Sequence, residues 1–478
     1  MLGIVIGALF GAGVFEDESH QNFLNVTTVA PTRTPSLTTS NQSSTSPSFS
    51  PSTFPSSEPT ATSRPTISEA PTRFFFSQRS EISSTSNGDR FGSSIALSKD
   101  GRVLAVGAPQ FTPHESIPQA GAVYLYVWEE NDWISSKAQF IVSGTYSQQG
   151  FGYSVALNDD GSVLAIGSSN SSPHGSTDGR FDVVSIYEYD VDQNNLIQQG
   201  ESIFKVDNGD GQLSASKVPL SGDGQVAIVT HKGSRNSVGL GYAQQYEYNG
   251  TDWLPFGGTL FGNALKDSFG ASLAIASDAT TLAVGAYDDV QDFPAYVQIW
   301  DWNSTEVEWI QRGQDLESSQ NGDRFGFAVD LSKDGSVLVV GAPHRKFIDV
   351  DDQQSGYVQV FQWDGLQWNS KGGTITLEDE AYNRLGESVS ISDDGNSLAI
   401  GVPSQDSATS GVDSGLVQLW QWNGLDWIPR GFSLRGDYAN GQFGESVVLS
   451  GDARTLVVGV PGLGGMNSPL SGKVRAFD

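Results

Sequence analysis

The sequence NGDRFGSSIALSKDGRVLAVGAP, at residues 87–109, decides the fold, because it returns almost unchanged as NGDRFGFAVDLSKDGSVLVVGAP at residues 321–343. Weaker copies of the same words lie between and after these two. Neighbouring copies are 56 to 62 residues apart. Each has one aromatic or aliphatic anchor, and the seven anchors are Phe91, Phe151, Leu213, Phe269, Phe325, Leu385 and Phe443. Seven copies at a nearly constant spacing indicate a repeat architecture.

Each copy has the pattern of four short strands. The first strand follows the Phe-Gly word, as at residues 154–157, and a tight Ser-x-Asp-Gly turn leads to a second strand such as 337–341. A loop follows, then a third strand such as 417–422, and an Asn-Gly or Asp-Gly hairpin starts the fourth at a Trp. Both faces of the third strand are mostly apolar, which is typical of a sheet covered on both sides. The sequence therefore predicts an all-β, seven-bladed β-propeller with four-stranded blades.

The two ends of the repeat region agree with a closed ring. The seventh copy stops after its third strand, at residues 474–478, whereas a spare strand, Arg73–Gln78, precedes the first copy. We expect this N-terminal strand to close the last blade, because closure removes the open edges that invite aggregation. All eleven tryptophans fall in third or fourth strands or at the turn joining them. Such regular recurrence favours a role in the core, although sugar-stacking platforms are a competing interpretation.

Three segments differ sharply in composition. Residues 1–16 hold an uncharged apolar run, residues 2–15, which is too short to span a bilayer and fits a signal peptide or a truncated membrane anchor. Residues 17–72 form a stalk: from Thr27 to Thr72, 24 of 46 residues are Ser or Thr, with eight prolines. We expect this stalk to be disordered, and either O-glycosylated or unmodified. Residues 73–478 form the propeller.

The net charge of −29 narrows the range of partners. The first 72 residues carry five acids and two bases, so the remaining 406 hold a net −26. Such a domain repels phosphate backbones, and we therefore expect no nucleic-acid partner. Cations, basic proteins and neutral sugars remain open. The absence of cysteine excludes disulfides, thiolate zinc sites and cysteine nucleophiles.

The Phe-Gly and Gly-Ala-Pro words, joined by a hairpin between the first two strands, resemble FG-GAP repeats such as those of the integrin α-subunit propeller. The resemblance covers residues 73–478 and is strongest in copies one and five, whereas copies two and three lose the second word. It implies a seven-bladed propeller, an extracellular location and ligand binding on one face. Many members of that family carry a calcium site in the first hairpin loop. Here the turns are short, as in Ser98–Gly101 and Ser332–Gly335, with too few oxygens to wrap calcium. We therefore expect no cofactor and do not carry calcium over to these turns.

Strand alternation sorts the loops between two faces. The first-to-second and third-to-fourth turns share one face and are mostly short and alike, and we call this the turn face. Second-to-third loops and blade-to-blade loops share the opposite face and vary, and we call this the variable face. Function concentrates on variable loops held by a rigid scaffold. The ligand-face residues predicted on this basis are His114, His174, Asp288, His344, Arg345, Asp406 and Asp413.

Other local features allow more than one interpretation. Asp190, Asp192, Asn194 and Glu201 have EF-hand-like spacing, but position six is Asn195 and a lengthened hairpin fits better. Asp349, Asp351 and Asp352 could hold a surface calcium ion, or form a solvated acidic loop. The tripeptide Arg435-Gly436-Asp437 matches an integrin-recognition motif, although its Gly belongs to the repeat. The N-glycosylation sequons begin at Asn25, Asn41, Asn170, Asn249 and Asn303.

Motifs of enzymes are scarce. The five histidines form no HExxH pair, and there is no GxSxG elbow or phosphate-binding loop. We expect a monomeric, non-enzymatic recognition or adhesion propeller at the cell surface, in the wall or outside the cell, which binds protein or glycan. Attachment to the membrane through residues 2–15 stays open. Two alternatives remain: a secreted carbohydrate-active hydrolase, for which an axial pocket with two carboxylates would argue, and a structural wall or matrix protein.

Overall fold

The computed structural model describes residues 76–129, 132–133, 140–169, 180–190, 195–206, 217–231, 240–264, 267–287, 294–318, 322–343, 356–377, 383–462 and 471–478. Every described residue belongs to one compact unit, Glu69–Asp478. The described residues contain strands and turns and no α-helix. No membrane-spanning helix is found among these residues.

The strands form seven sheets, which are the seven predicted blades. Blade 1 contains β2 (Ser94–Leu97), β3 (Val103–Ala108), β4 (Ala122–Glu129), β5 (Asp132–Trp133) and β6 (Phe140–Ser143). Blade 2 contains β7 (Phe151–Leu157), β8 (Val163–Ser168), β9 (Arg180–Asp190), β10 (Asn195–Gln198) and β11 (Ile203–Val206). Blade 3 contains β12 (Val226–His231), β13 (Tyr242–Tyr248) and β14 (Trp253–Phe261).

The remaining four blades follow the same order. Blade 4 contains β15 (Ser272–Ile275), β16 (Thr281–Ala286), β17 (Tyr296–Asn303), β18 (Glu308–Gln311) and β19 (Leu316–Glu317). Blade 5 contains β20 (Ala328–Leu331), β21 (Val337–Ala342), β22 (Tyr357–Trp363) and β23 (Trp368–Ser370). Blade 6 contains β24 (Ser388–Ile391), β25 (Ser397–Val402), β26 (Leu416–Trp422), β27 (Trp427–Pro429) and β28 (Leu434–Arg435). Blade 7 contains β29 (Val447–Leu449), β30 (Leu456–Val460), β31 (Lys473–Phe477) and β1 (Gln78–Ser83).

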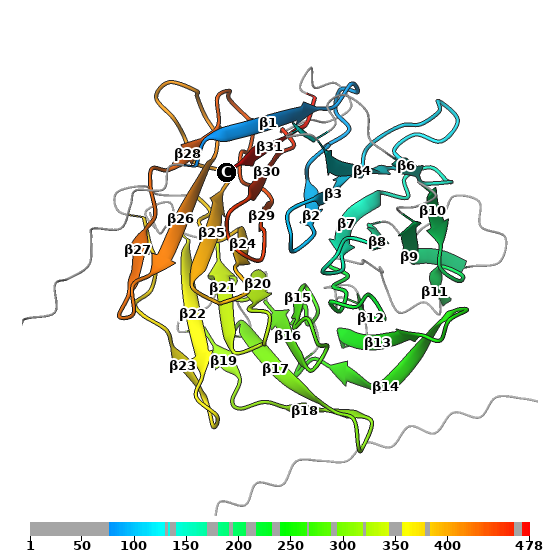
Figure 1. Cartoon of the computed structure of the whole chain (residues 1–478), viewed down its shortest axis with the longest axis vertical. Helices are drawn as coiled ribbons and strands as arrows, with labels where there is room; N and C mark the ends of the chain where they lie inside the picture. Colours follow the sequence, from blue (N-terminus) through cyan, green and yellow to red (C-terminus); the bar gives the residue numbers. More distant parts are fainter. Residues whose placement is uncertain are drawn as a thin grey trace, which may run out of the picture. The chain divides into compact units, whose positions relative to one another are not determined.

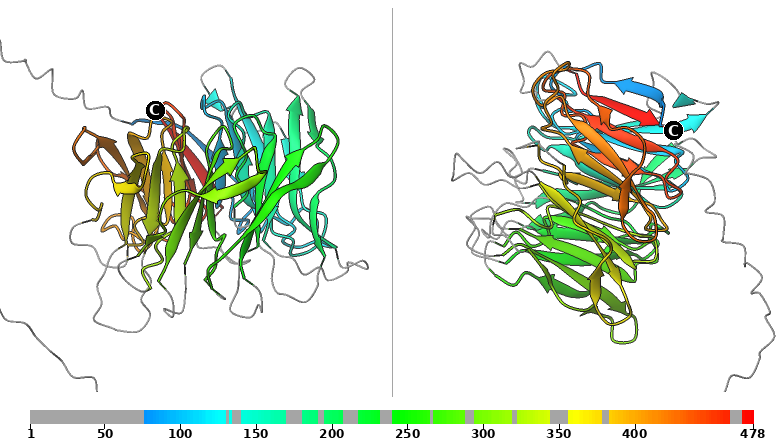
Figure 2. Two further views of the ribbon diagram at one scale, coloured as in Figure 1. Left: turned by 90° about the horizontal axis from the view of Figure 1, so that it is seen from below. Right: turned by 90° about the vertical axis from the view of Figure 1, so that its left-hand side faces the viewer.

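The blades are arranged radially around one axis, with the first strand of each blade innermost (Figure 1). Side views show the blades standing next to one another, with strands running roughly along that axis (Figure 2). In blades 1, 2, 4 and 6 the outer strand is interrupted, so that two segments pair with the same third strand. Blade 3, whose copy departs most from the repeat, has three strands, and its innermost position is reduced to a bridge between Leu220 and Ala227.

The N-terminal strand closes the last blade, as predicted, but at a different register. Strand β1 pairs antiparallel with β31, from Gln78 opposite Phe477 to Ser83 opposite Lys473. Ser77 and Asp478 extend the pairing with two backbone hydrogen bonds of 2.9 and 3.1 Å. The described part of the closing segment therefore runs from residue 77 to 83, further along the chain than the predicted 73–78, of which 73–75 lie outside the described residues. The segment runs past the whole of β31, so it covers the positions of both parts of the outer strand that β27 and β28 form in blade 6.

The Phe-Gly and Gly-Ala-Pro words meet between neighbouring blades. Gly107 of blade 1 lies against Gly152 of blade 2, so closely that a Cβ at Gly107 would stand 2.1 Å from the Gly152 carbonyl oxygen. Ser94 Oγ donates a hydrogen bond of 2.8 Å to that same oxygen. The arrangement recurs between blades 4 and 5, 6 and 7, and 7 and 1. The repeated words are therefore junctions between blades, where only glycine permits the close backbone approach.

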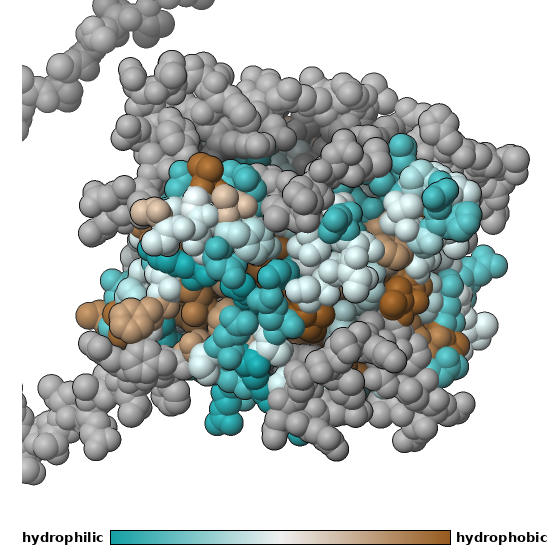
Figure 3. All heavy atoms as spheres, turned by 90° about the horizontal axis from the view of Figure 1, so that it is seen from above, coloured by the Kyte–Doolittle hydropathy of each residue, from teal (hydrophilic) through white to brown (hydrophobic). Residues whose placement is uncertain are grey.

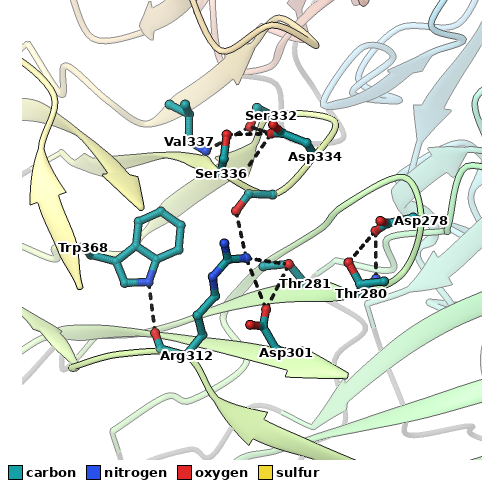
Figure 4. A network of polar contacts seen from close by, with 11 residues as sticks. Asp278, Thr280, Thr281, Asp301, Arg312, Ser332, Asp334, Ser336, Val337 and Trp368 are labelled. Atoms are coloured by element: carbon teal, nitrogen blue, oxygen red, sulfur yellow. Dashed lines mark hydrogen bonds and ion pairs between the residues drawn. The ribbon is translucent and has the colours of Figure 1, made fainter. Parts of the chain in front are cut away.

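A second set of junctions links the outer parts of neighbouring blades. Arg312, from the outer strand of blade 4, lies over Trp363 and Trp368 of blade 5 at 4.8 and 5.4 Å from the ring centroids. Its guanidinium donates to Thr281 Oγ1, Asp301 Oδ1 and the Gly335 carbonyl oxygen, while Trp368 Nε1 donates to the Arg312 carbonyl oxygen (Figure 4). The same figure includes the turn Ser332–Ser336, in which Ser332 Oγ accepts from the Val337 amide.

Equivalent contacts, in which a cation of one blade lies over an aromatic ring of the next, recur between other blades and include the N-terminal segment. Lys371 lies over Trp427 of the next blade at 5.7 Å, and its carbonyl oxygen accepts from Trp427 Nε1 at 2.8 Å. Arg430 lies 5.0 Å from the ring centroid of Phe76, and Arg79 lies 3.3 Å from that of Trp128. The N-terminal segment thus supplies both the aromatic ring that receives blade 6 and the cation that reaches blade 1. Cation–π contacts of this kind stabilise the ring closure.

The interior of each blade interface is apolar and close-packed. The anchors Phe91, Phe269, Phe325, Leu385 and Phe443 have at most 1% of their surface exposed. The tryptophans that begin outer strands, namely Trp253, Trp309, Trp368 and Trp427, are also buried, as predicted from their recurrence. The side of the propeller seen in Figure 3 is mainly hydrophilic, with separate small hydrophobic spots, as expected of a surface in contact with water.

Candidate functional site: an axial funnel

A funnel of about 680 Å³ lies on the propeller axis. Its wall is formed by the beginnings of the first strands, including Ile95, Val155, Val329 and Val447, and by the segment at Pro109–Gln110. The first strands begin at the variable face, so this is the end at which the funnel lies. The sequence predicted this face as the binding face because its loops vary; the funnel is a separate, geometric feature of the same end.

The position immediately after each Phe-Gly pair lines the funnel. In the copies that the structure describes here, this position holds Ser93, Tyr153, Ala271, Phe327, Glu387 and Glu445. The next position holds Ser94, Ser154, Ser272, Ala328, Ser388 and Ser446, and four of its serines, Ser94, Ser272, Ser388 and Ser446, donate the junction hydrogen bonds to the next blade. Both positions reach the funnel, but the second is mostly serine because it joins neighbouring blades, whereas the first differs from blade to blade.

Two adjacent blades contribute a pair of carboxylates. Arg90 NH2 donates to Glu445 Oε1 across the ring closure, and Arg384 NH2 donates to Glu387 Oε1 within blade 6. Burial raises the pKa of Glu445 above its ordinary value, and Arg90 and Arg384 oppose this rise. The two carboxylates are thus held by guanidinium groups at one side of the funnel.

Aromatic side chains line other parts of the wall. The rings of Tyr287 and Phe327 lie 5.2 Å apart, and the Arg324 guanidinium stands 5.6 and 5.7 Å from their centroids. Tyr153, on blade 2, also lines the funnel and is 46% exposed. Arg90, Arg324 and Arg384 each precede an anchor residue and have φ values of 58°, 60° and 57°. This left-handed backbone, supported by a carboxylate or amide two residues before the anchor, as in Asp89 to the Phe91 amide, fixes the direction of these side chains.

Lys217 is the single lysine among the described residues that line the funnel. It belongs to blade 3, whose first strand is irregular. Counted back from the turn serine Ser221, it stands where Ser94 stands in blade 1. Its side chain is exposed to the funnel but surrounded by protein, and burial lowers its pKa while Asp330 opposes that effect.

At the turn face the axis is closed by a ring of backbone hydrogen bonds. The second residue of each turn donates its amide to the carbonyl oxygen of the same residue in the next blade, at 2.7 to 3.2 Å. The ring runs through Lys99, Asp159, Gly222, Ser277, Lys333 and Asp393 to Gly451, and Gly451 donates back to Lys99. All seven blades take part, so the ring confirms the blade number independently of the sheets.

Charged side chains of this ring form ion pairs with one another at the turn-face end of the axis. Lys99 Nζ lies 3.1 Å from Asp393 Oδ1, and Lys333 Nζ lies 3.3 Å from Asp159 Oδ2. Burial would lower the pKa of Lys99, but Asp330 and Asp393 raise it above its ordinary value. Burial raises the pKa of Asp330, which accepts from the Ile391 amide at 2.8 Å. The closed end is therefore a network of satisfied charges.

Few of the ligand-face residues predicted from the sequence fall within the described residues. His114 is exposed, with its Nδ1 2.8 Å from Ser116 Oγ. Asp406 and Asp413 lie in one loop, where Asp406 Oδ1 accepts from the Asp413 amide at 2.9 Å. The structure brings these two together but not with His114 or the funnel wall. His174, Asp288, His344 and Arg345 lie outside the described residues.

The predicted metal residues are only partly covered. Asp192, Asn194, Asp349, Asp351 and Asp352 lie outside the described residues. Asp190 pairs with Asn195 at the tip of the β9–β10 hairpin, whereas Glu201 follows the far end of β10 and its amide donates to Asp252 Oδ1 at 3.0 Å. The hairpin therefore separates Asp190 from Glu201. No metal-binding group of three His, Cys, Asp or Glu side chains occurs among the residues the structure describes.

The tripeptide at residues 435–437 is part of the scaffold. Arg435 pairs with Leu416 in the sheet, and a Cβ at Gly436 would stand 1.9 Å from the Ser414 carbonyl oxygen. Asp437 accepts a hydrogen bond from Arg475. Of the sequon residues, Asn249 and Asn303 lie at turns between third and fourth strands, on the turn face, and Asn25, Asn41 and Asn170 lie outside the described residues.

Sequence reasoning missed the residues that build the funnel. Arg90 and Glu445 are 355 residues apart and come together only when blade 7 meets blade 1. A signal was nevertheless present, because the residue after Phe-Gly varies from Ser to Tyr, Phe and Glu while its neighbours repeat. Variation at one position inside a repeat could have identified the funnel wall.

Comparisons with known proteins support the fold. The model of the FG-GAP repeat family matches residues 83–126 and 318–361, which are copies one and five. Among solved structures, a similar chain is the hydrazine synthase of Kuenenia stuttgartiensis, with 13% sequence identity and a TM-score of 0.49, over 79% of this chain and 94% of that chain. This likeness carries no argument about function. A search of curated proteins gives no match.

Proposed function

Because the chain is an FG-GAP repeat β-propeller, we propose that it is a recognition module that binds protein or glycan at its variable face, with the axial funnel at the centre of the site. One observation carries the proposal. The wall combines a repeated serine of the blade junctions, as at Ser94 and Ser388, with the position before it, which differs in size, polarity and charge from blade to blade. A protein with a purely structural role has no need for this difference.

The proposal includes a location outside the cytoplasm. The apolar residues 2–15 and the Ser/Thr/Pro-rich stalk support export and display at a distance from the surface. Asn249 and Asn303 are accessible sequon residues on the turn face, so glycans there leave the funnel open. In both, the side-chain oxygen accepts backbone hydrogen bonds within its own turn.

A second candidate function is carbohydrate hydrolysis, which one specific observation favours. The funnel holds two carboxylates, and burial raises the pKa of Glu445, as is typical of a general acid. Glu387 would then serve as the second carboxylate of a glycosidase pair. Against catalysis, each carboxylate is held by an arginine, an arrangement that fixes a carboxylate for binding.

Replacing a variable-face loop tests the proposal. In the full chain, residues 407–411, whose backbone hydrogen bonds join Ser407 to Gly411, are replaced by a short Gly-Ser turn, and binding to arrays of glycans and surface proteins is compared with that of the parent. We expect binding to fall at least about tenfold, with an unchanged melting temperature, because loops on a rigid scaffold carry function. The matched control replaces the turn-face residues 303–307 with Asn-Gly. Loss of binding in the control but not in the loop variant would falsify the proposal.

A further inference from the structure

The polar wall of the funnel has unmet hydrogen-bonding capacity of both kinds. Arg90 Nε, Ser93 Oγ and Gln110 Oε1 are buried and have no hydrogen-bond partner among the described residues, and all three residues line the funnel. Arg90 Nε can only donate, Gln110 Oε1 can only accept, and a serine hydroxyl does both. Buried polar atoms are normally satisfied, so a ligand that meets this wall has to supply donors and acceptors side by side.

Hydroxyl groups meet this demand, and ions do not. An ammonium group only donates and cannot accept from Arg90 Nε, whereas a carboxylate or phosphate only accepts and cannot donate to Gln110 Oε1. Each hydroxyl of a sugar donates once and accepts twice. A saccharide therefore matches the wall in the blade 1 sector, where Ser93 and Gln110 lie.

The charges that line the funnel favour a neutral ligand. Among the described residues of the wall, Arg90 and Lys217 are basic and Glu387 and Glu445 are acidic, so the formal charges cancel. The repeat region as a whole is strongly acidic, which repels anionic polysaccharides. A neutral sugar needs no net charge on the wall and is not repelled by the acidic domain.

Aromatic side chains of the wall supply an apolar contact for the face of a sugar ring. Tyr153 and Phe327 occupy the same repeat position on blades 2 and 5, and Tyr287 packs against Phe327. A sugar ring has an apolar face of C–H groups that packs on an aromatic ring while its edge makes hydrogen bonds. Partly exposed aromatic residues beside unsatisfied polar groups suit such a ligand. The volume of about 680 Å³ lies within the range of about 300–1,000 Å³ that is typical of small-molecule sites.

We propose that the axial funnel binds the neutral terminal residues of a glycan, with Arg90, Ser93 and Gln110 as polar contacts and with Tyr153 of blade 2 and Phe327 of blade 5 as aromatic contacts. The inference rests on the proposed function and names the ligand class of the same site. It differs from the predicted loop residues His114, Asp406 and Asp413, which lie apart from the funnel wall.

The test is a glycan array followed by calorimetric titration of the full chain. The array displays neutral glycans ending in glucose, galactose, mannose or N-acetylhexosamine, next to sialylated and sulfated glycans. We expect binding to a neutral class and titration with the corresponding free oligosaccharide. Gln110→Ala and Tyr153→Ala should each weaken it at least about tenfold. The matched controls, Gln359→Ala in the third strand of blade 5 and Phe261→Ala in the outer strand of blade 3, change residues that do not line the funnel and should leave affinity unchanged.

The outcomes separate this inference from the proposed function. Binding restricted to sialylated or sulfated glycans, or affinity that the funnel variants leave unchanged while their melting temperature is that of the parent, overturns the saccharide inference. If only a surface protein binds, and Tyr153→Ala abolishes that binding, the saccharide inference fails and the recognition function stands. If a neutral glycan is shortened during incubation and Glu445→Gln stops this, the saccharide inference stands and hydrolysis replaces recognition.

Discussion

The two ends of the propeller axis are built from the same strands but by opposite rules. At the turn face, seven backbone amides and seven carbonyl oxygens close a ring, and the side chains around it pair with one another. At the variable face, the beginnings of the same strands surround a funnel whose wall has unlike residues and buried polar atoms without protein partners among the described residues. The comparison teaches that repetition marks the residues that hold the ring and that variation marks those available to a ligand.

The largest expected effect concerns a repeated glycine. Replacing Gly401 with Ala would place a Cβ 2.0 Å from the Gly444 carbonyl oxygen and 2.2 Å from Ser388 Oγ, at the junction of blades 6 and 7. We expect the free energy of unfolding to fall by about 4 kcal/mol or more, because neither backbone can move without separating two blades. Chemical denaturation measures this loss.

A second glycine serves as the control. Gly365 has a φ of +101° and no atom within 4 Å of its ideal Cβ, so Gly365→Ala tests backbone strain alone, at about 1–2 kcal/mol. Equal losses for the two variants would mean that the close approach between blades contributes nothing beyond ordinary glycine conformation.

The next largest effect concerns the cations that link outer strands. Arg312→Ala removes hydrogen bonds to Thr281, Asp301 and Gly335 together with the contacts to two tryptophans (Figure 4). We expect a loss of about 2–3 kcal/mol in unfolding free energy, again from denaturation curves. Arg454→Ala is the matched control, since Arg454 is 85% exposed and pairs only with Asp452 at 3.5 Å. Its loss should stay within about 0.5 kcal/mol. Similar losses for both arginines would contradict a special role for the outer junctions.

A smaller effect concerns the turn aspartates and is measured as a difference in sensitivity to acid. Burial alone would raise the pKa of Asp394, but hydrogen bonds from Ser392 and Asn396 lower it below its ordinary value of 3.8. A carboxylate whose folded pKa is lowered stabilises the fold above its unfolded pKa, and this contribution disappears as the pH falls through the folded value. We therefore expect the melting temperature of Asp394→Asn to decrease less than that of the parent when the pH is lowered from about 5 to about 2.

The control for this titration is Glu308→Gln, which removes a charge from an exposed position of β18. Its melting temperature should follow the parent at every pH. An acid-induced decrease in Asp394→Asn as steep as that of the parent would show that this turn does not contribute through its carboxylate.

Much of the fold could be predicted because repeated words report repeated packing. The seven anchors gave the number of blades, and the missing fourth strand of copy seven indicated closure by the N-terminal segment. The register of β1 could not be predicted, since it depends on Phe76 and Arg79 finding partners in blades 6 and 1. The ring of turn amides has no side-chain signature at all, because the bonds join backbone groups through Gly222 and Gly451 as readily as through Lys99.

The candidate site was less predictable for a physical reason. Loop variation identified the correct face for a funnel, but a funnel wall consists of strand residues whose neighbours come from other blades. Glu387 and Glu445 occupy equivalent positions in copies six and seven, while the arginine that holds Glu445 comes from copy one. A linear reading compares copies with one another, and it does not show which residues of different copies meet at the axis.

Glu445→Gln should have the smallest effect on stability. It also tests most directly whether a residue at the funnel end differs in its structural role from the repeated residues. Burial raises the folded pKa of Glu445 above its ordinary 4.5, so the folded state holds this proton more tightly than the unfolded chain does. The stability of the parent should therefore fall as the pH rises from about 4.5 through the folded pKa, and glutamine should remove that part of the slope.

At neutral pH the variant avoids burying a charge but leaves Arg90 without its carboxylate. Because the Arg90 side chain is 31% exposed to the funnel, water can solvate it, and the net change should stay within about 1 kcal/mol. Denaturation at a series of pH values measures both quantities. A loss comparable to that of Gly401→Ala would mean that the variable position holds the ring as firmly as the repeated one, and the distinction between the two ends of the axis would disappear.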